Sequence, residues 1–213
     1  MKINKIEVYV VGEDDVTKAI IKRILNYSNN FEVISEIPAR GGQVKSQIEQ
    51  YNKLSETSPV ILLIDLDNND CAPQLLQQLI SAKNDDFIFN IAVDETEAWL
   101  MADREGFAEY FKIKLEDMPV ACQTKQGGRK PLIEMNFSVK SSWFLTHELI
   151  KKSKSSEFIQ QLTPKPNAAK GPEYNICILP FIENKWNIDN AKQNSDSLGR
   201  MITRINNLLT RKK

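Results

Sequence analysis

The sequence predicts an α/β fold in which a mostly parallel sheet is flanked by helices and followed by a mainly helical C-terminal region. Strand-like and helix-like patterns alternate up to residue 111, and such βαβα order is typical of parallel sheets covered by helices. One segment, 60–64, is an unbroken apolar run, which is typical of a strand buried on both faces. After residue 111 the strand patterns fade.

Each predicted element of the first part follows from residue periodicity. Val16, Ile20 and Ile24 recur at helical spacing and share one face. Pro73 stands where a first helical turn tolerates proline. The expected strands span 6–11, 31–37, 60–64 and 87–93, and the expected helices span 16–25, 44–54, 73–82 and 96–111.

The remaining chain predicts helices joined by loops. We expect loops at 122–131 and 163–172 and helices within 143–162, 174–186 and 197–209. The 213 residues suit one domain with a sizeable appendage. The predicted division is an α/β core at 1–111 and a basic, mainly helical region at 112–213, packed on or beside it.

Composition narrows the class of protein. Hydrophobic residues make up 41% and charged residues 26% of the chain, as in ordinary globular proteins, and no segment approaches the ~20 apolar residues that span a bilayer. Cys71, Cys122 and Cys177 lack paired spacing, and His147 is the single histidine. We therefore expect a cytoplasmic protein without a membrane partner, a disulfide framework, a zinc ribbon or a multi-histidine metal site.

The net charge of zero conceals an uneven distribution. Residues 1–111 hold 19 acidic and 10 basic side chains, whereas residues 112–213 hold 9 acidic and 18 basic ones. A basic C-terminal half indicates a polyanionic partner, although exposed lysines on helices explain the same excess.

Acidic side chains follow three of the four predicted strands. Ligands of parallel α/β sheets bind beyond the carboxyl ends of the strands, and carboxylates gathered there repel one another unless a cation lies among them. Oxygen-only ligands select Mg²⁺ or Mn²⁺. The residues concerned are Glu13, Asp14 and Asp15, then Asp65, Asp67 and Asp70, then Asp94, Glu95 and Glu97.

Other interpretations of these acids compete with a metal site. An EF-hand counted from Asp65 would need glycine at the position of Asp70, and a D-x-D-x-T phosphatase would need threonine at Asn69. A phosphate-accepting receiver domain fits the GEDD after the first strand and Asp65 after the third, but it does not require Asp67 or Glu97. Solvated loops remain a further alternative.

Three segments together resemble the Toprim domain: VVGEDDVTKAIIKRIL, ILLIDLDNND and VDETEAWLMAD. The Toprim pattern places a glutamate after the first strand and D-x-D after the third strand of a Rossmann-like sheet. The likeness is greatest to Toprim proteins related to the overcoming-lysogenisation-defect (OLD-like) nucleases, particularly a small bacterial family with an E-x-E-A-W-L-like third motif. It covers roughly residues 5–111, and KGPEYN, FIENKW and SLGR also resemble that family.

The resemblance assigns roles to several acids. Glu13 corresponds to the acid that binds metal or acts as general acid/base, and Asp65 and Asp67 correspond to the D-x-D metal ligands. Many Toprim domains have glycine directly after the glutamate, whereas here Asp14 follows it, so the loop differs locally. Asp14 and Asp15 are interpreted either as extra ligands or as exposed loop acids, and the second interpretation is favoured.

The third motif implies further ligands and a basic residue. Glu97 corresponds to its acid, and Glu95 and Asp70 are expected to bind a second ion or to support the ligands. Trp99 and Leu100, on the same expected helix, are interpreted as core residues. A basic side chain commonly stabilises developing charge at such sites, and the candidates are Lys170, Lys130 and Arg129.

Nucleic-acid contacts are expected from basic residues near glycine or proline. Arg40 follows the second strand in ARGGQVK, where a phosphate contact competes with a simple turn. The basic C-terminal region is expected to supply most of the affinity for phosphate backbones. The residues expected to contribute are Lys125, Arg129, Lys130, Lys165 and Lys170.

Carboxylate-bound Mg²⁺ or Mn²⁺ suits phosphodiester hydrolysis, since it activates water and neutralises phosphate charge. The main prediction is a divalent-metal-dependent Toprim nuclease of DNA or RNA; the resemblance adds anti-phage defence and a separately encoded ATPase, because the chain has no G-x-x-x-x-G-K-[ST] motif. Alternatives are a catalytically silent Toprim module that binds nucleic acid or docks on the ATPase, and a receiver-like signalling domain. A homodimer is compatible with each.

Overall fold

The computed structural model describes residues 5–38, 42–67, 69, 71–124 and 131–212. The chain divides into two compact units, one formed by residues 1–92 with 200–213 and the other by residues 93–199. The boundary predicted at residue 111 falls inside the second unit.

The first unit is built on the parallel sheet that the sequence predicts. Its four strands lie in the order β2-β1-β3-β4, and every neighbouring pair is parallel. Val60–Ile64 is fully buried, which confirms that the apolar run is a strand covered on both faces. The strands are β1 (Ile6–Gly12), β2 (Phe31–Glu36), β3 (Val60–Asp65) and β4 (Phe87–Ala92).

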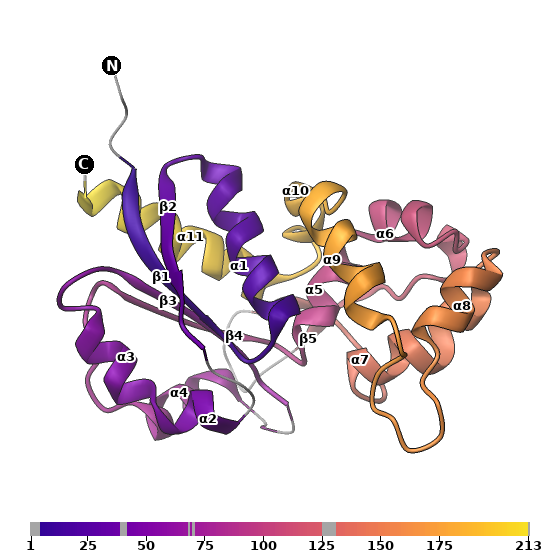
Figure 1. Ribbon diagram of the computed structural model, residues 1–213, viewed down its shortest axis with the longest axis horizontal. Helices are drawn as coiled ribbons and strands as arrows, with labels where there is room; N and C mark the ends of the chain where they lie inside the picture. The colour runs from indigo at the N-terminus through magenta and orange to yellow at the C-terminus, as the bar shows by residue number, and fades with distance from the viewer. Residues whose placement is uncertain (1–4, 39–41, 68, 70, 125–130, 213) are drawn as a thin grey trace. The chain divides into compact units, whose positions relative to one another are not determined.

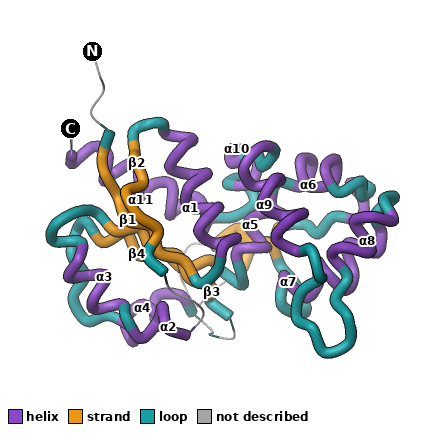
Figure 2. Tube along the Cα trace, viewed as in Figure 1, coloured by secondary structure: helices purple, strands orange, loops and turns teal. Residues whose placement is uncertain are grey.

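Helices cover both faces of this sheet. Right-handed crossovers are the rule for parallel strands, and with this strand order they place the β1–β2 helix on one face and the later helices on the other. Figure 1 shows α1 and α11 on one side of the sheet and α3 and α4 on the other, and Figure 2 sets its strands apart by colour. The crossover helices are α1 (Asp15–Ser28), α2 (Gly42–Ser46), α3 (Ile48–Leu54) and α4 (Ala72–Leu79).

The C-terminal helix α11 (Asp196–Lys212) returns to the sheet unit. The guanidinium of Arg204 donates to the backbone oxygen of Phe89 at 3.1 Å and to Oδ1 of Asn90 at 2.7 Å. Arg211 donates to the backbone oxygen of Asp85 at 2.7 Å. The last turns of the chain are therefore part of the α/β unit.

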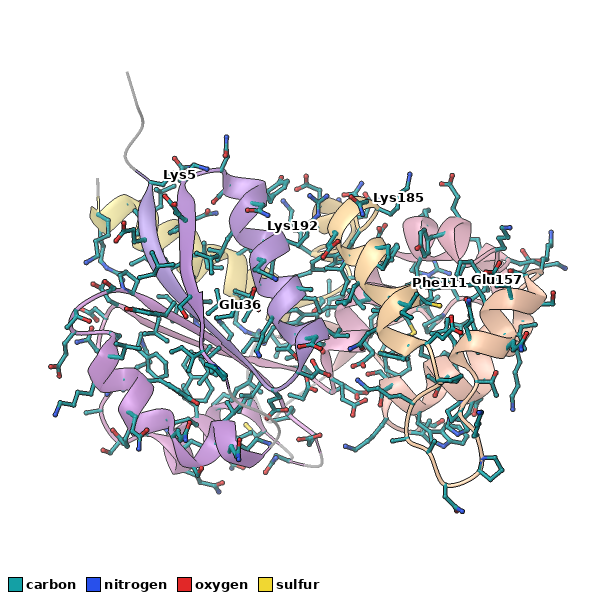
Figure 3. The ribbon with its side chains drawn as sticks, in the orientation of Figure 1. Lys5, Glu36, Phe111, Glu157, Lys185 and Lys192 are labelled. Carbon is teal, nitrogen blue, oxygen red and sulfur yellow. The ribbon has the colours of Figure 1, made fainter. Side chains whose placement is uncertain are left out.

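The second unit is mainly helical, as predicted. Its core includes the fully buried Trp99, Leu100 and Trp186, which confirms the core interpretation of Trp99 and Leu100, and an aromatic cluster around Phe111, labelled in Figure 3. Its helices are α5 (Thr96–Ala102), α6 (Arg104–Tyr110), α7 (Ser141–Phe144), α8 (Ser156–Leu162), α9 (Tyr174–Asn184) and α10 (Ile188–Ala191). Short 3-10 helices η1 (Leu115–Asp117) and η3 (Ile150–Lys152) and a π-helix, η2 (Leu145–Leu149), complete it.

Two predictions for this unit were wrong. The segment predicted as a loop at 122–131 contains part of β5 (Ala121–Thr124), which pairs antiparallel with β6 (Leu132–Met135). The helix predicted over 96–111 is broken at Asp103, whose carboxylate accepts from the backbone N–H of Gly106 at 3.3 Å and caps α6. An aspartate that bonds the backbone ahead of it favours a new helix start over an uninterrupted helix.

Within residues 5–38, 42–67, 69, 71–124 and 131–212, which the structure describes, no helix is both long enough and apolar enough to cross a membrane.

Candidate functional site

The carboxyl ends of β1 and β3 meet at the switch point of the sheet. These two strands are neighbours, and the chain leaves them toward opposite edges, since β1 leads to β2 and β3 leads to β4. Open α/β sheets bind ligands at such switch points. Glu13 directly follows β1, Asp65 is the last residue of β3, and Asp67 lies two residues beyond it.

The turn after β1 is held by short local contacts. A Cβ atom at Gly12 would lie 3.0 Å from the Cγ2 atom of Thr17, so the strand end passes close to α1. Asp14 caps α1, because its carboxylate accepts from both the backbone N–H and the hydroxyl of Thr17 at 2.8 Å. Asp14 therefore has a structural role that its interpretation as an exposed loop acid did not include, whereas Asp15 is exposed.

The loop after β3 turns sharply at Asp67. This residue has a φ of +53°, a left-handed conformation that aspartate and asparagine adopt more readily than most residues. The side-chain amide of Asn69 donates to the backbone oxygen of Leu66 at 2.7 Å. The D-x-D motif therefore starts in a strand and ends in a tight turn.

Lys45, from α2, joins the two loops. Its Nζ atom lies 3.1 Å from Oδ2 of Asp67 and 3.7 Å from Oε1 of Glu13. The exposed fractions of the three side chains are 28% for Lys45, 16% for Glu13 and 33% for Asp67. Two carboxylates from adjacent strand ends thus share one cation, and partial shielding from solvent strengthens their attraction to it.

Burial raises the pKa of Glu13 above its ordinary value, and the negative charge of Asp67 acts in the same direction. The ammonium of Lys45 and a hydrogen bond from the backbone N–H of Asp65 oppose this rise. The outcome is a carboxyl group that protonates more readily than an exposed glutamate. This property suits a proton donor or acceptor.

In the second unit, Glu95 is buried and bound to the start of α7. Its carboxylate accepts from the backbone N–H of Ser142 at 2.8 Å and from the hydroxyl of Ser141 at 3.4 Å. The ammonium of Lys140 lies 3.3 Å from Oε1 of Glu95. Glu95 therefore satisfies one backbone donor in the first turn of a helix while a lysine balances its charge.

Glu97 is also buried and paired. Oε1 of Glu97 accepts from the hydroxyl of Tyr174 at 2.7 Å and lies 3.2 Å from Nζ of Lys170. The ammonium of Lys170 also lies 4.5 Å from the centroid of the Tyr174 ring. This carboxylate, tyrosine and lysine form a group in which the buried charge is hydrogen-bonded and neutralised.

Asp94 carries the largest carboxyl pKa rise that the structure resolves. Burial raises its pKa to about 6, and the charges of Glu95 and Glu97 add to the rise, while hydrogen bonds from Ser141 lower it. Oδ1 of Asp94 accepts from the backbone N–H of Ser141 at 3.2 Å, and Asp94 has a φ of +66°.

The oxygen ligands at the switch point suit a hard divalent cation. Glu13 and Asp67 already share one positive charge, that of Lys45. Among the residues that the structure describes, no group of three or more His, Cys, Asp and Glu side chains is arranged to hold a metal ion. The fit to a divalent cation therefore rests on two carboxylates of the first unit, those of Glu13 and Asp67. It rests also on Asp65, which ends β3 two residues before Asp67.

The predicted site residues fall into three classes. Glu13, Asp65 and Asp67 lie together in the first unit, whereas Glu95, Glu97 and Lys170 belong to the second. Lys165, in the second unit, is exposed. The remaining predicted residues lie outside the described ranges, namely Arg40, Asp70, Lys125, Arg129 and Lys130.

Sequence reasoning missed the lysine partners Lys45 and Lys140. Lys45 stands in ARGGQVK, the glycine-containing segment from which only Arg40 was predicted to contribute, and Lys140 directly precedes α7. The available signal was the need for positive charge beside each acidic loop. That need can be met by a side chain as well as by an ion from solution.

Comparison with known protein families places this chain in one of them. Residues 11–136, more than half of the chain, match a family described as a domain of unknown function, DUF4276. The comparisons found no match among curated proteins and none among solved structures. The matched range includes both strand-end loops of the switch point and the motif that contains Glu95 and Glu97. The chain belongs to the DUF4276 family.

Proposed function

We propose that this protein is a divalent-metal-dependent nuclease that hydrolyses phosphodiester bonds. One observation carries the proposal: Glu13 and Asp67 converge on a single positive charge, 3.7 and 3.1 Å away, at the switch point of a parallel sheet. The resemblance of the same residues to the Toprim acidic motifs supplies the reaction class.

Asp65 and Asp67, with Glu13, would hold Mg²⁺ or Mn²⁺. Such an ion supplies activation of water and neutralisation of phosphate charge. Lys45 would then leave its carboxylate partners and lie beside the bound phosphate, where its ammonium offers three donors. Glu13, with its raised pKa, would exchange a proton with a reacting oxygen.

The second unit supports a narrower role for Lys170 than the one predicted. Its ammonium is bound to the buried Glu97 and lies over Tyr174. We propose that Lys170 holds Glu97 in place, and that any catalytic contribution it makes depends on release from this pair. Glu95 and Glu97 stay candidates for a second ion.

A catalytically silent module is the second candidate. The observation that favours it is that Lys45, Lys140 and Lys170 each contact a carboxylate predicted to bind metal. Lysines that neutralise these acids permanently would make the fold stable without an ion and would leave no ligand set. Binding of nucleic acid or of a partner ATPase would then be the remaining function.

Cleavage by the purified full-length chain separates the two candidates. Circular and linear single- and double-stranded DNA and RNA would be incubated with Mg²⁺, Mn²⁺ or EDTA, with Asp67→Asn beside the wild type. The proposal expects metal-dependent cleavage that the variant lacks. Equal product from both proteins would assign the activity to a contaminant or to other residues.

Anti-phage defence, a separately encoded ATPase and a homodimer rest on the family resemblance alone and stay predictions. The receiver-like alternative expects a fifth parallel strand that carries a lysine, and the sheet formed by the described residues has four strands. No observation favours that alternative here.

A further inference from the structure

The chain has three tryptophans, and one differs from the others in its surroundings. Trp99 and Trp186 are fully buried. The indole N–H of Trp99 donates to Ser197 Oγ at 2.8 Å, and the indole N–H of Trp186 donates to the backbone oxygen of Trp99 at 3.3 Å. Trp143, on α7, is 43% exposed. The core explains Trp99 and Trp186 but leaves Trp143 without a packing role of this kind.

Trp143 is organised by a neighbouring ring. The rings of Trp143 and His147 are stacked, with centroids 4.5 Å apart and planes 6° from parallel. Nδ1 of His147 lies 3.2 Å from the backbone oxygen of Trp143, and the hydroxyl of Thr146 lies 3.0 Å from the same Nδ1 atom. These contacts hold the two rings as a flat pair on the protein surface.

The backbone below this pair is irregular. His147 lies in the π-helix η2, which follows α7 directly and is followed by η3. Single π-helical turns are rare in proteins, and those that do occur are often found at functional sites. Here the π-helical segment carries one of the two stacked rings.

The segment that carries the pair is rich in lysine. Residues 140–154 contain four lysines and one acidic residue, Glu148. Two of these lysines are paired, Lys140 with Glu95 and Lys152 with Asp117. Lys151 and Lys154 are exposed, and Val139, which precedes this segment, is 39% exposed. A planar apolar surface within a positively charged segment is complementary to a nucleobase joined to a phosphate backbone.

We propose that the Trp143–His147 pair is a base-stacking site for unpaired nucleotides, with the exposed Lys151 and Lys154 contacting the phosphates. This inference deepens the proposed function, on which it rests for the substrate class. The exposed ring surface of Trp143 takes the base, while its stacking on His147 fixes the ring in advance and reduces the entropy lost on binding. A protein partner for the same surface is the competing outcome.

Tryptophan fluorescence tests the proposal without any cleavage. The full-length protein in EDTA is titrated with a thymidine oligonucleotide of about 12 nucleotides, a length within single-strand site sizes, and with the matching uridine oligonucleotide. An abasic oligonucleotide of equal length retains the phosphates but has no bases. Because Trp143 is the exposed tryptophan, base stacking is expected to quench its emission.

The expected result is quenching by a base-containing oligonucleotide and little quenching by the abasic one. The affinities of the Trp143 variants, which lack this reporter, are measured by fluorescence anisotropy of a dye-labelled oligonucleotide. Trp143→Ala is expected to weaken binding roughly five- to hundredfold, and Trp143→Phe, which keeps a stacking ring, is expected to weaken it less. Tyr27→Ala removes a 52% exposed aromatic residue of the first unit and serves as the matched control. If the oligonucleotide no longer quenches the tryptophan emission of Trp143→Ala, Trp143 is verified as the reporter.

The outcomes separate this inference from the proposed function. Quenching without any metal-dependent cleavage would support the stacking site and contradict the nuclease. Cleavage by a wild type that binds no more tightly than Trp143→Ala would contradict the stacking site alone. Equal affinity for abasic and base-containing oligonucleotides, or no binding of either, would overturn the inference and assign Trp143 to a protein interface.

Discussion

The ammonium of Lys45 lies 3.1 Å from the carboxylate of Asp67, on the turn that ends the D-x-D motif. Glu13, from the neighbouring strand end, lies 3.7 Å from the same ammonium. A lysine side chain therefore supplies positive charge to both acidic loops at this sheet edge. A divalent cation that binds these carboxylates would have to displace the ammonium of Lys45.

Replacing Lys45 with methionine tests this exchange. The metal-free variant is expected to lose about 1 kcal/mol of unfolding free energy at low ionic strength, since two partly buried carboxylates lose their shared partner. The pKa of Glu13 is expected to rise further, because Lys45 is the largest cause that lowers it. Urea denaturation in EDTA measures the first effect.

The same variant is expected to gain more stability from Mn²⁺ than the wild type does, because the ion no longer displaces an ammonium. Lys22→Met is the matched control, since its pair with Glu36 is 38% and 40% exposed and is expected to contribute little. A smaller Mn²⁺ response in Lys45→Met than in Lys22→Met would show that Lys45 helps the ion to bind.

Asp94 is expected to make stability depend on pH. The pKa of Asp94 in the folded protein, about 6, lies above the ordinary 3.8. Its contribution to the free energy of unfolding is therefore fully present below pH 3.8 and is lost as the pH rises through about 6. Asp94→Asn removes this loss and should stabilise the protein at pH 8 by about 1–2 kcal/mol, a value reduced for partial exposure. Thermal unfolding in EDTA from pH 4 to about 8 measures the difference.

Asparagine suits this position because it tolerates the φ of +66° and still accepts from Ser141. Asp94→Ala loses the acceptor and is disfavoured at this φ, so it is expected to be less stable than Asp94→Asn. An unchanged pH profile in Asp94→Asn would assign the titration to another group.

Tyr174→Phe is expected to destabilise the second unit. The substitution removes a 2.7 Å hydrogen bond to the buried Glu97, which is worth about 1.5–3 kcal/mol for a charged acceptor. Combining it with Lys170→Met in a double-mutant cycle measures their coupling around Glu97. Additive losses of unfolding free energy would indicate that the two residues act independently.

The basic C-terminal region is expected to provide most of the nucleic-acid affinity. Neutralising the five predicted basic residues should flatten the salt dependence of binding by about 0.7–0.9 in logarithmic slope for each phosphate that is no longer neutralised. Lys170 is expected to contribute least, because it is paired with Glu97. Binding in Ca²⁺, at several salt concentrations, measures the slope; an unchanged slope would favour the silent module. The five residues are Lys125, Arg129, Lys130, Lys165 and Lys170.

Strands β3 and β4 were predictable because they are strongly apolar and buried. Val60–Ile64 forms a fully buried strand, and its run of apolar residues has few alternative interpretations. The hairpin β5–β6 was not predictable in the same way. Its strands have four residues each, and Cys122, Gln123 and Thr124 give no apolar alternation.

The acids of the switch point were predictable and their lysines were not. Strand ends locate Glu13, Asp65 and Asp67, since parallel neighbours end at one sheet edge. Lys45 reaches them from α2 through a tertiary contact 22 residues away from Asp67 in sequence. A long flexible side chain at that separation carries no periodic signal, so only the folded structure shows which acid it meets.

The most direct test of the central claim is the melting temperature of the chain with and without Mn²⁺. If Glu13, Asp65 and Asp67 bind the ion, Mn²⁺ at a hundred times its dissociation constant should stabilise the wild type by about 3 kcal/mol and raise its melting temperature. The double variant Asp65→Asn with Asp67→Asn should show no such rise in melting temperature. Asp15→Asn, which replaces an exposed acid on α1, should retain the rise. An equal rise in the double variant would place the ion elsewhere and contradict the account.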